Sequence, residues 1–114
     1  MNSVELVGRL VRDPEQRQGA AAFTIAVDRP AKQGEEKQAD FIRVVTFGKL
    51  GETCGKYLTK GRLVAVQGRI HTGSYEGKDG KTVHTTDVAA QNVDFLDSPK
   101  KQNDFEAIDE PVPF

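Results

Sequence analysis

The sequence has few of the residues that build disulfides and metal sites. Its single cysteine, Cys54, has no second cysteine with which to form a disulfide or share a zinc ion, and the only histidines are His71 and His84. We expect Cys54 to be a small buried side chain, and we expect no metal or other cofactor. An enzymatic function is disfavoured, because the acidic residues are scattered over predicted loops and the tail instead of converging on a reaction centre.

Long apolar runs and a strong basic charge are also missing. No apolar run approaches the roughly 20 residues that span a membrane, and the first residues lack the basic start and apolar run of a signal peptide, so we expect a cytoplasmic protein. The chain has 114 residues, which is enough for one domain with a modest core. Its net charge is -1. Residues 1–96 carry 14 basic and 12 acidic residues, and residues 97–114 carry two and five. The body is therefore slightly basic and the end acidic.

What the sequence does contain is a strand at residues 40–49 with two different faces. Alternation places Ile42, Val44 and Thr46 on a core face. The opposite face combines two aromatic rings with a guanidinium: Phe41, Arg43, Val45 and Phe47. Because an unpaired buried charge is costly, this face is expected to stay near water, where it suits the stacking of nucleic-acid bases. The competing interpretation is that both phenylalanines are core and that the arginine pairs with a carboxylate at an edge.

Alternation predicts four further strands, at residues 3–11, 22–28, 62–75 and 82–96. Gly8 interrupts the first and indicates a bulge or sharp bend. Polar segments at 29–39 and 76–81 are expected to be hairpin connections, the second with an Asp-Gly turn.

A short amphipathic helix is predicted over residues 49–58, between the third and fourth strands. Its apolar stripe comprises Leu50, Cys54, Tyr57 and Leu58. Gly61 is expected to terminate it. The order of elements is that of an all-β, five-stranded OB-fold barrel with one short helix between strands 3 and 4, occupying residues 1–97.

Residues 98–114 are expected to form a disordered tail, because they are polar and contain three prolines. The tail ends in an acidic pair followed by apolar residues: Asp109, Glu110, Pro111, Val112, Pro113 and Phe114. Such a tip suits capture by a small basic and apolar pocket on a partner. The alternative is a ragged end with no role.

Four segments in this order resemble the bacterial single-stranded DNA-binding proteins, over residues 1–96. They are Val4-Glu-Leu-Val-Gly-Arg-Leu with Arg12-Asp-Pro, Phe41-Ile-Arg-Val-Val-Thr-Phe-Gly-Lys, Tyr57-Leu-Thr-Lys-Gly and Gly68-Arg-Ile. The tail tip resembles the acidic, Pro-Phe-ending peptide of the same family. The chain is similar to the short forms carried by a phage, a plasmid or a Gram-positive bacterium.

The resemblance implies which residues contact the DNA. Bases are expected to stack on Phe41, Phe47 and Tyr75, while a fourth family aromatic, which falls near Pro30, is absent here. The basic cluster ahead of Tyr75 is thinned to His71, Gly73 and Ser74. From the resemblance and from the 29–39 loop, phosphate contacts are expected at Arg43, Lys49, Arg69, Lys60, Arg29 and Lys32.

The resemblance also implies a homotetramer that coats single-stranded DNA without strong sequence preference. It would act in replication, recombination and repair, and recruit enzymes of those processes through the tail tip. Two alternatives to this function remain. One is a barrel that binds RNA, since stacking does not distinguish the sugars. The other is a barrel that serves mainly as a protein adaptor.

Overall fold

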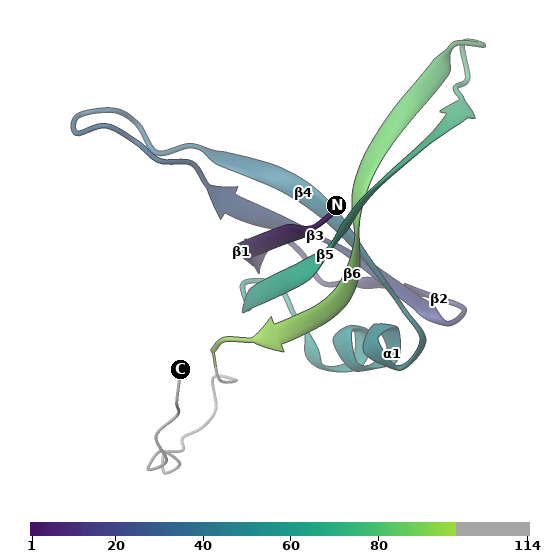
Figure 1. The fold of residues 1–114 in the computed structure, drawn as a ribbon, viewed down its shortest axis with the longest axis horizontal. Helices are drawn as coiled ribbons and strands as arrows, with labels where there is room; N and C mark the ends of the chain where they lie inside the picture. The colour runs from purple at the N-terminus through teal and green to yellow at the C-terminus, as the bar shows by residue number, and fades with distance from the viewer. Residues whose placement is uncertain (98–114) are drawn as a thin grey trace.

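The computed structural model describes residues 1–97, which form six strands and one short helix (Figure 1). The strands are β1 (Val4–Leu10), β2 (Glu15–Arg17), β3 (Ala20–Asp28), β4 (Ala39–Phe47), β5 (Leu63–Glu76) and β6 (Thr82–Phe95). The helix α1 (Gly48–Tyr57) lies between β4 and β5, as predicted. The predicted tail, with its tip, lies outside the described residues. Within them, no helix has the length and apolar character needed to cross a membrane.

Five of the six strands close into a ring, and β2 lies outside it, paired with β3 alone. The six strands are hydrogen-bonded in the order β1, β5, β6, β4, β3, β2, and β1 also pairs with β3. At this closure Arg9 faces Ala26, and Leu10 faces Ile25. Gly8 permits the approach, because a Cβ atom on it would lie 2.5 Å from the backbone carbonyl oxygen of Ala26.

Of the two features predicted at Gly8, a bulge or a sharp bend, the bulge is absent. The pairing of β1 with β5 runs without a shift from Val4 to Arg9. The glycine is needed for a close contact between backbones instead, which is the other common reason for glycine inside a strand. A register shift lies instead in the pairing of β5 with β6, where Gln67 pairs with Asn92 and Gly68 with Ala90.

The inside of the ring is the hydrophobic core. Its most buried members come from four strands and the helix, and include Ile25, Val44, Val64, Val66, Val88 and Cys54. Thr46 is also fully buried, and its hydroxyl donates a hydrogen bond of 2.8 Å to the carbonyl oxygen of Ala21. Because Ile42 packs against this core too, the predicted inner face of β4 is confirmed.

Helix α1 packs on the ring with a narrower apolar stripe than predicted. Cys54 and Leu58 reach the core, but Tyr57 is 54% exposed. Leu58 follows Cys54 by four residues, which is about one helical turn, so it lies over Cys54 on the core side. Tyr57 is then directed outward. Gly61 does not cap the helix, because the helix already ends at Leu58, whose N–H donates to the carbonyl oxygen of Cys54. Gly61 instead has a φ of 90° in the turn that follows.

The strand β2 was not predicted: the five predicted strands form the ring, and β2 adds a sixth strand to the sheet outside it. Its residues, Glu15 to Arg17, are all exposed and pair with Ala20 to Ala22 at the start of β3. Since the interaction is made by the backbone, the side chains carry no apolar alternation by which the sequence could signal it.

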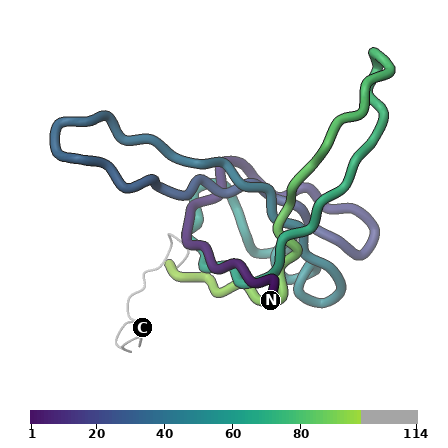
Figure 2. The backbone as a smooth tube through the Cα atoms, turned by 45° about the horizontal axis from the view of Figure 1, so that its top comes forward, coloured from purple at the N-terminus to yellow at the C-terminus, as the bar shows by residue number. Residues whose placement is uncertain are grey.

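Two long hairpins extend from the ring as two arms, which we call the β3–β4 arm and the β5–β6 arm (Figures 1 and 2). The first carries the predicted loop, in which the Arg29 N–H donates to the carbonyl oxygen of Gln38. The second ends in the predicted turn, with Gly80 at a φ of 80°. The strands β4 and β6 pair in parallel only at Val44–Val45 with Val88–Ala89. Beyond this contact the arms diverge.

The Cys54 thiol is expected to be unreactive in the folded protein. Burial raises its pKa to about 11, and the side chain has no exposed surface. The thiolate is the reactive form, so at pH 8 iodoacetamide should label the native chain far more slowly than the chain unfolded in urea. Mass spectrometry of timed samples measures both rates. Equal rates would show that the core around this thiol opens freely.

Candidate functional site

The outer face of β4 is open to solvent, as predicted from its alternation. Phe41 is 68% exposed and Phe47 is 61% exposed. The interpretation that placed these rings in the core is therefore wrong. Its second half is correct in part, because Arg43 does have a carboxylate beside it, although not at an edge of the sheet. Its Nε atom lies 3.9 Å from Oδ1 of Asp87 on β6, a strand between β5 and β4.

The neighbouring strand β3 leaves the rings uncovered. Its outward residues are small, and each lies opposite a residue of β4: Ala20 opposite Phe47, Ala22 opposite Val45, Thr24 opposite Arg43 and Ala26 opposite Phe41. A methyl group cannot cover a phenyl ring, so both rings stand above this surface. Sequence analysis missed these small residues as part of the site, although their spacing of two residues was visible.

On its other side, β4 borders a pocket of about 410 Å³ that it shares with β5 and β6. We call it the β4–β6 pocket, and it is lined by Val45, Phe47, Arg69, His71, Asp87 and Ala89. The register explains this grouping, since Ala89 pairs with both Val45 and Arg69. Asp87 was not predicted as a site residue, and His71 was noted only as a remnant of a basic cluster.

Tyr75 is separated from the other two predicted aromatics. It is 58% exposed and pairs with Val83 on the β5–β6 arm, beyond the point where the arms part. Phe41 and Phe47 share β4, six residues apart, which corresponds to about 20 Å along an extended strand. The three rings are therefore spread over both arms, and the structure brings only Phe47 together with Arg69.

The predicted cationic residues fall into two groups. Arg29 and Arg43 are in ion pairs, the first with Asp40 at 2.7 Å. The hydrogen bond from Arg29 to Asp40, and the charge of that carboxylate, raise the pKa of Arg29. Within residues 1–97 no ion pair is formed by the other four, which are Lys32, Lys49, Lys60 and Arg69.

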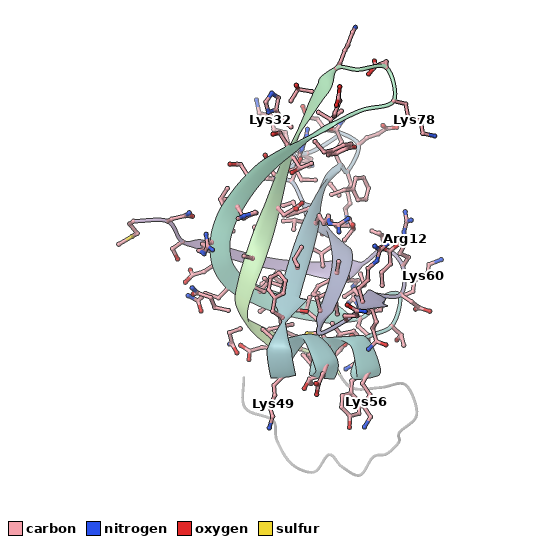
Figure 3. The ribbon with its side chains drawn as sticks, turned by 90° about the vertical axis from the view of Figure 1, so that its right-hand side faces the viewer. Arg12, Lys32, Lys49, Lys56, Lys60 and Lys78 are labelled. Atoms are coloured by element: carbon pink, nitrogen blue, oxygen red, sulfur yellow. The ribbon has the colours of Figure 1, made fainter. Side chains whose placement is uncertain are left out.

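The three predicted lysines, which form no ion pair within residues 1–97, lie in two loops and in α1. Lys49 extends from the first turn of α1, two residues after Phe47, and Lys60 lies near Arg12 (Figure 3). The second proximity is supported by a hydrogen bond of 2.8 Å from the Lys60 N–H to the Asp13 carboxylate. Arg12 was not predicted as a contact.

The chemistry of this surface is that of binding. In the part of the chain that the structure describes, no group of three or more His, Cys, Asp or Glu side chains is arranged to hold a metal ion. The surface instead presents open aromatic rings next to cations. This combination recognises bases and phosphates of an unpaired strand.

Comparison with known proteins gives a consistent result. Residues 1–96 match the model of the single-strand binding protein family. The chain is 52% identical over 104 residues to a single-stranded DNA-binding protein of Clostridium perfringens, covering 86% of this chain and 67% of the relative. It is 49% identical over 109 residues to single-stranded DNA-binding protein 3 of Listeria innocua, covering 90% and 67%. It is 44% identical over 119 residues to single-stranded DNA-binding protein 2 of Clostridium acetobutylicum, covering 99% and 89%.

Proposed function

Because the chain belongs to the single-strand binding protein family, whose members bind single-stranded DNA and are not enzymes, we propose that it coats and protects unpaired DNA in the cytoplasm. It does so without strong sequence preference, during replication, recombination and repair. The closed ring with its helix between β4 and β5 supports an OB-fold barrel as the binding domain, residues 1–97.

The observation that carries this proposal is the outer face of β4. Two phenyl rings, each more than half exposed, lie on a strand whose other face is in the core. Apolar side chains that are exposed together on one face of a sheet can mark an interaction site. Stacked bases on Phe41, Phe47 and Tyr75 would cover this apolar area, and every base has a face that can stack.

Phosphates of the same strand are bound by the nearby cations. Arg69 lines the β4–β6 pocket with Phe47, and Lys49 follows Phe47 by two residues on α1. Lys32 and Lys60 extend the positive charge toward the β3–β4 arm and the end of α1. Arg43 and Arg29 contribute less, because each would exchange a carboxylate neighbour for a phosphate. Neutralising phosphates releases counterions, so binding weakens as salt rises.

Binding should prefer single strands and depend on salt. We expect oligothymidine to bind more tightly than duplex DNA of the same length, with log affinity falling by about 0.7 per log unit of salt for each phosphate contact. Fluorescence anisotropy at several salt concentrations measures this, and an RNA oligomer tests for sugar preference. Equal affinity for the duplex, or no effect of salt, would contradict the proposal.

The substitution Phe47→Ala should weaken binding to oligothymidine by about 1–3 kcal/mol, because one stacking platform is lost. The fold should persist, since the ring is 61% exposed. Tyr57→Ala is the matched control: this ring is 54% exposed but belongs to the last residue of α1 and not to β4. Equal loss in both variants, or no loss in Phe47→Ala, would show that the stacking assignment is wrong. Thermal melting verifies that both variants fold.

A homotetramer is proposed from the family resemblance and from the exposed side of β1. Only Arg9 and Leu10 of this strand pair with β3, so within residues 1–97 the edge from Val4 to Gly8 has β5 on one side alone. Val7 on this stretch is 53% exposed. We expect a mass in solution of four chains by light scattering, with or without DNA. A monomer at micromolar concentration would reject the assembly.

The tail, residues 98–114, is proposed to recruit replication, recombination and repair enzymes through its tip. The support is its sequence alone, an acidic pair followed by Pro-Val-Pro-Phe. Deleting residues 109–114 should abolish the binding of such enzymes to DNA-bound protein and leave the affinity for oligothymidine undiminished. A loss of DNA affinity would mean that the tip belongs to the DNA site instead.

A further inference from the structure

Asp87 is unexpected at its position, because its carboxylate is negatively charged and lies in the middle of the surface proposed to bind DNA, which is also negatively charged. Its side chain is only 24% exposed, and its one ion-pair partner within residues 1–97 is Arg43, with 3.9 Å between Nε and Oδ1. No hydrogen bond from another described residue reaches this carboxylate. A carboxylate offers about four acceptor positions, and the contact of 3.9 Å with Arg43 is too long to be a hydrogen bond. Asp87 therefore has acceptor capacity that a ligand can fill.

The residues around Asp87 form three sides of a site for a flat ring. Phe47 supplies a stacking surface in the β4–β6 pocket, and Arg69 supplies a guanidinium. Asp87 pairs with His71, and Ala89 pairs with Arg69, so the carboxylate and the guanidinium come from adjacent strands, two positions apart. That offset is about 7 Å along the strand. A purine that enters the pocket can therefore meet the acceptor, Asp87, at one edge and the donor, Arg69, at the adjacent edge.

The chemistry of a carboxylate distinguishes between the four bases. Its two oxygens accept two parallel hydrogen bonds only where two donors are adjacent. Guanine offers such a pair, N1–H and N2–H, on its Watson–Crick edge. Adenine and cytosine each place an acceptor beside the amino group, and thymine places carbonyls on both sides of N3–H. Arginine likewise favours guanine, because it donates to O6 and N7 together.

We propose that the β4–β6 pocket is a guanine subsite on an otherwise unselective surface. Asp87 accepts from N1–H and N2–H, Arg69 donates to O6 and N7, and the ring stacks on Phe47. Asp87 thereby sets a preference for one base at one position, and keeps phosphates away from it. The proposal rests on the proposed function, since it requires DNA to bind across this face.

The test compares oligomers that differ in one base. A thymidine oligomer of roughly 12 nucleotides, about one binding site, competes with the same oligomer carrying one central deoxyguanosine, using the full chain and fluorescence anisotropy. The guanine oligomer should bind roughly fivefold or more tightly. Deoxyinosine, which lacks the N2 amino group, and 7-deazadeoxyguanosine, which lacks N7, should each lose part of this gain.

Variants identify the residue responsible. Asp87→Asn should abolish the guanine preference without weakening binding to oligothymidine, and Arg69→Gln should reduce the preference independently. Asp94→Asn is the control: it makes the same charge change on the same strand, at an exposed position opposite Ala65 and outside the pocket. Asp94→Asn should keep the full preference. Thermal melting verifies folding, and Arg69→Gln keeps the test decisive if Asp87→Asn does not fold.

Each failure has a distinct meaning. Equal affinity of the wild-type chain for both oligomers overturns the subsite, as does a guanine preference that survives in Asp87→Asn. If that variant binds both oligomers more tightly by the same factor, Asp87 only repels phosphates and the subsite is overturned as well. If oligothymidine binding does not respond to Phe47→Ala, the proposed function of this face fails, which is a separate outcome.

Discussion

The pairing of β1 with both β5 and β3 is the constraint on which the rest of the structure depends. It closes the ring at Arg9 and Leu10, where Gly8 lets two backbones approach more closely than any side chain would permit. The strand β4 pairs with β3 on one edge and β6 on the other, and the closed ring gives it a packed interior on one face. Because every second side chain of β4 is fixed in the interior, the side chains between them must face outward. The exposure of Phe41 and Phe47 is therefore a consequence of how the ring closes.

Sequence alone was sufficient wherever the signal is local. Alternation predicted both faces of β4, and the 3.6-residue period of the apolar side chains predicted the position of α1. The Asp-Gly dipeptide predicted the turn at the end of the β5–β6 arm. It failed where pairing is made by the backbone, as in β2, and where two candidates compete for one helix position, as at Tyr57. Asp87 was out of reach for another reason. It reaches Arg43 through a parallel pairing between segments more than 40 residues apart, which no local pattern reports.

The charges of the surface divide between arginine and lysine. All four ion pairs within residues 1–97 are made by arginines, at positions 9, 29, 43 and 62. Two of them, Arg9 and Arg62, hold Asp97 at the end of the ring and act structurally. The lysines of this region take no part in ion pairs and can meet phosphates without first giving up a carboxylate. A chain with nearly balanced charge thus keeps cations available for DNA.

Where the two arms leave the ring, β4 and β6 are paired at only two positions. Extending either hairpin by an even number of residues per strand would preserve which side chains face in and which face out, and would leave the core untouched. Under the proposed function, the reach of the protein along a DNA strand could therefore be changed through the arms without altering the packed interior of the ring.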